Sequence, residues 1–94
     1  MCSKYVNQII SASSCEKRLE ISFECYQDQV KRFNQSPSNQ KQEEGCRMIT
    51  NLVNCCDQIL CAPPDRDSSI KEYSEYVKAI YGSFDFSKCK GLIW

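Results

Sequence analysis

Four cysteines arranged as a mirrored pair constrain the fold of this chain more than any other feature. Nine residues separate Cys15 from Cys25, and nine separate Cys46 from Cys56. The residue numbers sum to 71 for Cys15 with Cys56 and for Cys25 with Cys46, which is the condition for two antiparallel segments bridged at two levels. The pattern therefore predicts an antiparallel helical hairpin held by these two disulfides.

The first arm of this hairpin is predicted as a helix over residues 14–33, because apolar residues recur there at steps of three and four. Its predicted inner stripe consists of Cys15, Leu19, Phe23, Tyr26, Val30 and Phe33. Ser13 and Glu16 have the spacing of a capping box at the start. The turn formers from Asn34 to Asn39 end the helix. A turn centred between residues 35 and 36 would satisfy the same sum of 71.

The second arm is predicted to begin after Asn39, with Gln42 completing a weaker capping box. It should end at Ala62, before two prolines. Its predicted inner face consists of Ile49, Leu52, Val53, Cys56, Ile59 and Leu60. Gly45 would allow the two arms to approach closely at the bridge between Cys25 and Cys46.

Two further helices are predicted outside the hairpin. The residues 2–11 show a short amphipathic pattern. Another helix follows the prolines, with Ser69 and Glu72 as a capping box and Gly82 as a left-handed C-terminal cap. The expected fold is thus one all-α domain over residues 1–94, a small disulfide-stapled bundle of about four helices.

The cysteine content indicates an oxidising compartment, because eight cysteines in 94 residues are typical of a disulfide scaffold and an even number can all pair. Cys2 and Cys89 are expected to reach the end of the third helix, at Cys55 or Cys61, with the choice of partner left open. A metal centre is disfavoured because the chain has no histidine and no Cys-x-x-Cys. No cofactor is expected.

The expected location is extracellular, in a mature form from which a secretion signal has been removed. No apolar run approaches the roughly 20 residues that span a bilayer, so membrane insertion is not expected. Twelve basic residues balance twelve acidic ones. This balance gives no net field that would favour nucleic acid.

Two stretches resemble a known family. Cys46-x9-Cys56-x4-Cys61 and the closing Phe84-Asp85-Phe86-Ser87-Lys88-Cys89 are similar to the middle and terminal blocks of the nematode secreted helical domain of unknown function nineteen. This resemblance implies secretion and a helical architecture, but no defined activity. Residues 15–56 also resemble the coiled-coil-helix proteins of the mitochondrial intermembrane space, although four further cysteines and a fourth helix depart from that pattern.

An enzyme is not expected, because histidine is absent and every cysteine has a bridge partner. The adjacent Glu43 and Glu44 are interpreted as a solvated helix start near its positive end. The sequence instead favours an extracellular binding protein, such as an effector or toxin-like module, that acts on a protein partner such as a receptor or channel. Its oligomeric state is not predicted.

Aromatic and arginine residues dominate protein-binding surfaces. The predicted partner contacts are therefore Tyr76, Tyr81, Trp94, Arg66 and Lys90, although Tyr81 and Trp94 would serve equally well as a cover for the core. The alternative function is a carrier of a small apolar or lipid ligand between helices, lined by Ile9, Phe23, Leu52 and Ile80. Asn34-Gln35-Ser36 is a candidate glycosylation site at Asn34.

Overall fold

The structure is a computed structural model that describes residues 5, 7, 8 and 14–89. These residues form α-helices and short helical turns, and no strand occurs among them. The helices are α2 (Cys15–Gln35), α3 (Lys41–Asn51) and α4 (Arg66–Ile80). The expected all-α class is confirmed for the described residues. The first expected helix, over 2–11, lies outside them except at positions 5, 7 and 8.

Shorter helical turns connect and extend these helices. The 3-10 turns are Ser38–Gln40, Asp57–Ile59 and Phe86–Lys88, and a π-helix, Leu52–Cys56, continues α3. Because the hydrogen bonds of a π-helix span five residues instead of four, side chains after Asn51 are offset from the positions of an uninterrupted α-helix.

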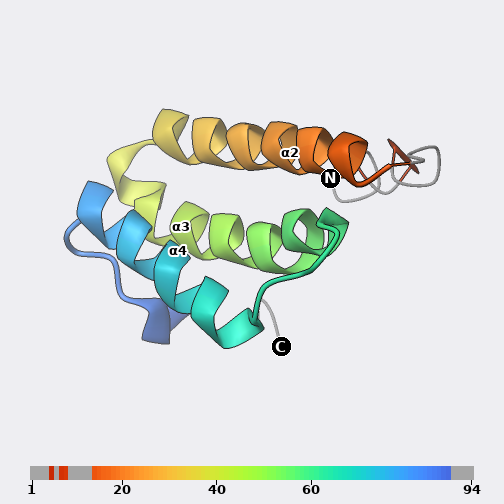
Figure 1. Cartoon of the computed structure of the whole chain (residues 1–94). Helices are drawn as coiled ribbons and strands as arrows, with labels where there is room; N and C mark the ends of the chain where they lie inside the picture. The colour runs from red at the N-terminus through yellow and green to blue at the C-terminus, as the bar shows by residue number, and fades with distance from the viewer. Residues whose placement is uncertain (1–4, 6, 9–13, 90–94) are drawn as a thin grey trace.

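Helix α3 lies between the other two helices (Figure 1). Helix α2 runs along one side of it in the opposite direction, and α4 crosses its other side. The chain then leaves α4 and turns back toward α3, where Cys89 is bonded to Cys46. The predicted bridge from Cys89 to Cys55 or Cys61, at the end of the third helix, is therefore wrong, because Cys89 is bonded near the start of α3.

The hairpin forms in a different register from the predicted one. Cys15 is bonded to Cys61 and Cys25 to Cys56. The predicted pairs of Cys15 with Cys56 and of Cys25 with Cys46 are therefore wrong. The residue numbers of the two bonded pairs sum to 76 and 81, so each residue of α2 faces a later residue than expected.

The register moves because the turn lies further along the chain. Helix α2 continues to Gln35, and a 3-10 turn at 38–40 precedes α3, which centres the connection on residue 38. Nζ of Lys41 donates to the carbonyl oxygens of Phe33 at 2.6 Å and Asn34 at 3.2 Å, and it lies 4.5 Å from the centroid of the Phe33 ring. This donor satisfies carbonyls at the end of α2 and supports the two extra residues.

The remaining cysteines agree with a fully oxidised chain. Of the described cysteines none is free. Cys55 is also disulfide-bonded, whereas Cys2 lies outside the described residues. The adjacent Cys55 and Cys56 both lie in the π-helix at the end of α3.

The buried face of α2 also differs from the predicted stripe. It consists of Ile21, Cys25, Gln29 and Phe33. Leu19 and Phe23, which were predicted to face inward, are 50% and 61% exposed. One reason for this different face is a polar contact, in which Oε1 of Gln29 accepts a hydrogen bond from Nδ2 of Asn51 on α3 at 3.0 Å. Apolar periodicity gives no sign of that contact, which fixes the rotation of α2 together with the bridge at Cys25.

The inner face of the second arm is confirmed, with one residue less buried than expected. Ile49, Leu52, Val53, Cys56 and Ile59 are buried, and Leu60 is partly buried. The core of the described residues therefore centres on α3 and its π-helix. It also includes Val77 of α4, Phe84 of the C-terminal segment, and Tyr5, whose hydroxyl donates to the carboxylate of Asp28.

Gly45 allows a close approach, but to a different neighbour from the predicted one. A Cβ atom at this position would lie 2.8 Å from Cγ1 of Val77 and 2.9 Å from Cε1 of Phe84. The missing side chain therefore makes room for α4 and the C-terminal segment, and not for α2.

Two predicted capping boxes are corrected. Gln42 does not cap α3: its Nε2 donates to the carbonyl of Asp85 at 2.7 Å, and its Oε1 accepts from the amide of Asp85 at 2.9 Å. Helix α4 starts before Ser69, because Asp65 is the N-cap and accepts from the amide of Ser68 at 3.0 Å. Aspartate after two prolines is a strong start signal.

The end of α4 and the start of α2 complete the comparison. Gly82 follows the helix without the left-handed backbone predicted for it. The amide of Tyr81 instead closes the last turn by donating to the carbonyl of Val77 at 2.8 Å. At the start of α2, Ser14 is the N-cap and accepts from the amide of Lys17 at 3.2 Å, while Ser13 lies outside the described residues.

Candidate binding face on helix α2

An apolar stripe runs along α2 beside its buried face. Its residues are Leu19, Phe23, Tyr26 and Val30, spaced by four, three and four. Leu19 and Phe23 are two of the three large apolar side chains exposed in the described part of the chain, with Ile80 the third. Tyr26 and Val30 are partly buried against the core. The stripe thus extends from the edge of the core into solvent.

A shallow open groove of about 780 Å³ covers the C-terminal half of this surface. Among the described residues its lining comes entirely from α2: Phe23, Tyr26, Gln27, Asp28, Val30, Lys31, Asn34 and Gln35. We call this surface, with the stripe and the exposed residues next to it, the outer face of α2.

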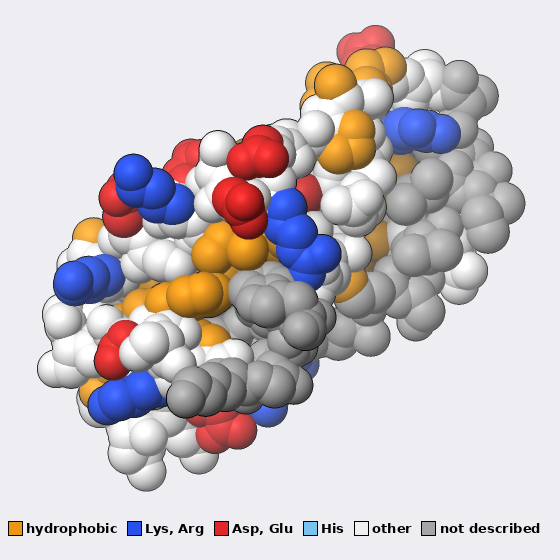
Figure 2. Space-filling view, turned by 90° about the horizontal axis from the view of Figure 1, so that it is seen from below, with side chains coloured by type: hydrophobic (Ala, Val, Ile, Leu, Met, Phe, Trp, Pro, Cys, Tyr) orange, Lys and Arg blue, Asp and Glu red, His pale blue; other side chains and the backbone are white. Residues whose placement is uncertain are grey.

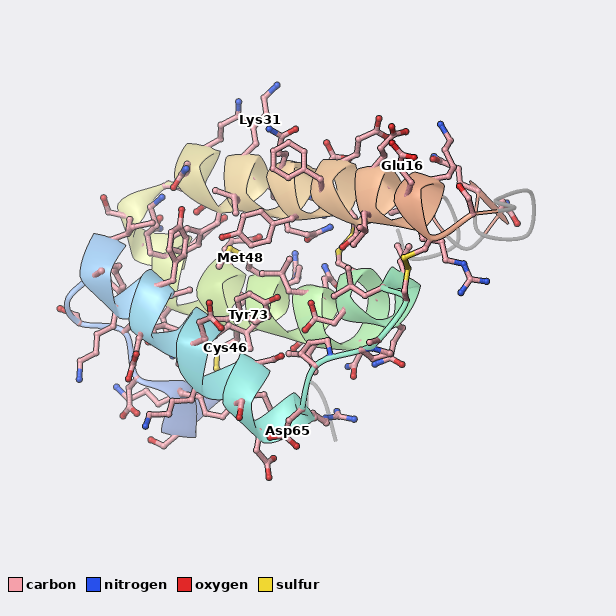
Figure 3. The ribbon with its side chains drawn as sticks, in the orientation of Figure 1. Glu16, Lys31, Cys46, Met48, Asp65 and Tyr73 are labelled. Atoms are coloured by element: carbon pink, nitrogen blue, oxygen red, sulfur yellow. A yellow bond between two sulfur atoms is a disulfide. The ribbon has the colours of Figure 1, made fainter. Side chains whose placement is uncertain are left out.

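Acidic residues border the stripe at its N-terminal half. Glu16, Glu20 and Glu24 follow one another at four-residue steps, so they form a ridge on the helix surface, and all three are exposed. Nζ of Lys17 lies 3.4 Å from a carboxylate oxygen of Glu20, and both side chains are about 60% exposed. In Figure 3 the labelled Glu16 and Lys31 project from the side of α2 that faces away from α3.

Covalent and aromatic contacts hold this helix in place. The bridge from Cys25 to Cys56 fixes its middle and that from Cys15 to Cys61 fixes its start. The rings of Tyr26 and Tyr73 lie 6.4 Å apart between centroids, which ties α2 to α4. The outer face therefore belongs to a rigid element and not to a loop.

Three of the five partner contacts predicted from the sequence lie among the described residues. Tyr76 and Tyr81 are partly buried and pack against the core, in accordance with the alternative reading of Tyr81 as a core cover. Arg66 is exposed at the start of α4. Lys90 and Trp94 lie outside the described residues. Whether any of these residues contacts a partner stays a prediction.

Of the residues predicted to line a carrier cavity, the three that are described do not share an interior site. Leu52 is fully buried in the core, whereas Phe23 on α2 and Ile80 on α4 are 61% and 45% exposed. Ile9 lies outside the described residues. These positions give no shared interior site for an apolar ligand.

The candidate glycosylation site lies in a helix, not in the predicted loop. Asn34 is an exposed residue in the last turn of α2 and lines the groove. The hydroxyl of Ser36 donates to the carbonyl of Phe33 at 2.6 Å. A glycan at Asn34 would therefore occupy the C-terminal end of the outer face. Its presence stays a prediction.

The other charged sites of the sequence are structural in form. Glu43 and Glu44 lie in the first turn of α3, and both pair with Arg47, at 3.7 and 3.0 Å.

A buried polar pair joins α4 to the core, where the hydroxyl of Tyr73 donates to Oδ1 of Asp57 at 2.7 Å. Burial, and then this hydrogen bond, raise the pKa of Tyr73.

Within residues 5, 7, 8 and 14–89 no helix is long and apolar enough to cross a bilayer. Over the same part of the chain, no group of three or more metal-ligating side chains is close enough to hold an ion. The acidic ridge on α2 is thus not such a group.

Basic and acidic side chains alternate on the face shown in Figure 2, which is seen from below the view of Figure 1. A second groove, of about 370 Å³, lies between α4 and the segment 84–86. Its lining includes acidic and basic side chains as well as apolar ones. The outer face of α2 is distinguished by its exposed aromatic side chain and by its mainly acidic border.

No family model, curated protein sequence or solved structure matches this chain. The candidate site therefore depends on geometry and chemistry alone. Sequence reasoning missed Leu19 and Phe23 as surface residues because it assigned them to the core. The four-residue spacing of Glu16, Glu20 and Glu24 was visible in the sequence and marks the solvent side of α2.

Proposed function

We propose that this chain is a secreted, non-enzymatic binding protein that contacts an extracellular protein partner through the outer face of α2. The observation that carries the proposal is the exposure of Leu19 and Phe23 on a helix fixed by two disulfides. Exposed apolar side chains in a row have no role in the core. Aromatic side chains are frequent among the residues that dominate binding energy.

The rigidity of α2 also supports a binding function. A surface fixed by disulfides loses little conformational freedom when it binds, so more of its contact energy appears as affinity. The bridges at Cys15 and Cys25 lie at the two ends of the segment that contains Leu19 and Phe23. The bonded state of the described cysteines also supports an oxidising, extracellular location.

Affinity capture from extracellular fluids and membrane extracts tests the proposal, with the oxidised chain immobilised through a tag. The variant Leu19→Ser with Phe23→Ser should lose the captured protein, because it removes both exposed apolar side chains. Ile80→Ser is the matched control, since Ile80 is similarly exposed but lies on α4. Equal capture by the α2 variant would contradict the proposal, and loss only on Arg66→Ala would favour the α4 surface predicted from the sequence.

The carrier function is retained as the alternative to be tested on the same protein. Native mass spectrometry after incubation with a lipid extract would show a stoichiometric adduct if the chain carries an apolar ligand. We expect no adduct, because the groove on α2 is open and its lining includes Asp28 and Lys31.

A further inference from the structure

We infer that the partner segment that fits the outer face of α2 is a cationic amphipathic helix. This inference rests on the proposed function and adds the chemistry of the partner. Its first basis is the spacing of the stripe from Leu19 to Val30 by four, three and four residues. That spacing is the seam along which two helices pack side by side.

The length of the stripe agrees with a helical partner. Val30 lies eleven positions after Leu19, which corresponds to roughly 17 Å, or about three turns. A partner helix would place apolar residues at intervals of three and four along the same length. An extended strand would leave its own backbone hydrogen-bonding groups without partners, because α2 offers no sheet edge.

Charge determines which amphipathic helix fits. The exposed carboxylates beside the stripe belong to Glu16, Glu20 and Glu24. Asp28 lines the groove as well, but it accepts a hydrogen bond from Tyr5. Among the described residues, the cations on this surface are Lys17, which pairs with Glu20, and Lys31, at the far end of the groove. The carboxylates outnumber the ammonium groups.

The helix dipole explains only the first residue of the acidic ridge. Glu16 lies in the first turn of α2, where a carboxylate interacts favourably with the helix dipole. Glu20 and Glu24 lie beyond that turn, so the dipole does not explain them. They follow Leu19 and Phe23 directly in the sequence, and they would meet the flank of any helix that packs on the stripe.

A second copy of the chain is a poorer occupant than a cationic helix. Two copies packed through this face would bring two mainly acidic borders together, and like charges across an interface disfavour association. Lysine or arginine along the flank of a partner helix would instead pair with Glu20 and Glu24. Such pairs raise the association rate and the specificity, and their effect decreases with salt.

The test uses the full oxidised chain and two synthetic helical peptides. Both peptides have leucine at intervals of three and four, and they differ only in their flanks, which are lysine in one and glutamate in the other. Fluorescence anisotropy measures the Kd of each at low and at physiological salt. We expect the lysine peptide to bind at least roughly tenfold more tightly, with a difference that decreases as salt is added.

Variants separate the charge from the apolar contact. Glu20→Gln with Glu24→Gln should weaken the lysine peptide by roughly three- to tenfold and leave the glutamate peptide unchanged or tighter, because exposed pairs contribute modestly. Phe23→Ser should weaken both peptides by roughly tenfold or more. Glu75→Gln on α4 is the control for charge, and circular dichroism verifies that each variant is folded.

The outcomes distinguish the two levels of the proposal. Equal binding of both peptides, with loss on Phe23→Ser, overturns the cationic partner but leaves the binding face in place. Unchanged binding by the Phe23→Ser variant overturns both. A dimer in sedimentation equilibrium that dissociates on Phe23→Ser would identify a second copy as the occupant and overturn the inference.

Discussion

At the scale of single residues, the carboxylate of Asp57 is buried and only partly hydrogen-bonded. Its side chain is only 6% exposed, and Oδ2 has no hydrogen-bond partner among the described residues. Tyr73 provides the hydrogen bond to Oδ1. Leaving a buried acceptor without a partner costs more than the hydrogen bond itself contributes, because the group cannot recover its hydration.

The substitution Tyr73→Phe should therefore lower the free energy of unfolding by about 1–3 kcal/mol. Denaturant titration of the oxidised chain, read by circular dichroism, provides the measurement. Tyr81→Phe is the matched control, because its ring is also partly buried and its hydroxyl makes no hydrogen bond within the described residues. A loss below about 0.5 kcal/mol, which is typical of a neutral surface change, would contradict the role assigned to Tyr73.

The hydroxyl groups of Tyr5 and Tyr73 make the stability of the fold depend on pH in the alkaline range. Burial and then the hydrogen bond to Asp28 raise the pKa of Tyr5 from 10.0 to about 12, and the pKa of Tyr73 is raised in the same way by burial and Asp57. Above the pKa of the unfolded tyrosines, the folded chain thus binds more protons than the unfolded chain. This contribution to stability is complete below pH 10.0 and is lost as pH rises through the folded pKa.

Spectrophotometric titration of tyrosinate should show this difference directly. We expect part of the tyrosine absorbance change in the folded chain to occur at higher pH than in the denatured chain. The double variant Tyr5→Phe and Tyr73→Phe should reduce that late fraction, to which Tyr26 also contributes because burial raises its pKa. Coincident titration curves for the folded and denatured chains would disprove the assignment.

At the scale of helices and their contacts, Gly45 lies where α3 packs closely against α4 and the C-terminal segment. Gly45→Ala would gain helix propensity, worth up to about 1 kcal/mol. The new Cβ would, however, lie within 3.0 Å of the buried side chains of Val77 and Phe84. Overpacking of this kind costs about 1–3 kcal/mol.

We therefore expect Gly45→Ala to be destabilising in spite of its better propensity, by a net loss of up to about 2 kcal/mol. The midpoint of guanidinium unfolding at constant slope measures it. Gly82→Ala is the control, because a Cβ there meets no atom within 4 Å. A Gly45→Ala variant more stable than the parent chain would show that α4 moves to make room.

The elements also show what sequence reasoning could and could not establish. Periodicity and turn residues predicted the helices and the inner face of α3, because these depend on local patterns. The register was predicted wrongly, because a difference of two residues at the end of α2 and an added 3-10 turn displace every pair. The contact of Gln29 with Asn51 gave no apolar signal, so Phe23 was assigned to the core.

At the scale of the whole molecule, the described bridges hold α3 as a central scaffold. Cys56 ties the end of this scaffold to α2, and Cys46 ties its start to the C-terminal segment. Both bridges are buried, whereas Cys15 and Cys61 are exposed. A reductant must reach a sulfur atom to open a disulfide, so access differs among the three bridges whose cysteines are both described.

Among these three bridges, limited reduction should therefore open the one from Cys15 to Cys61 first. Alkylation at acidic pH, followed by peptide mapping, identifies the first thiols to appear and verifies the pairing. The start of α2 would then be released, while Cys25 still holds the segment with Phe23 against α3. Peptide binding should consequently survive this step and decrease only when the buried bridge of Cys25 opens. Early labelling of Cys25 or Cys46 would show that the molecule loosens from its centre and not from this end.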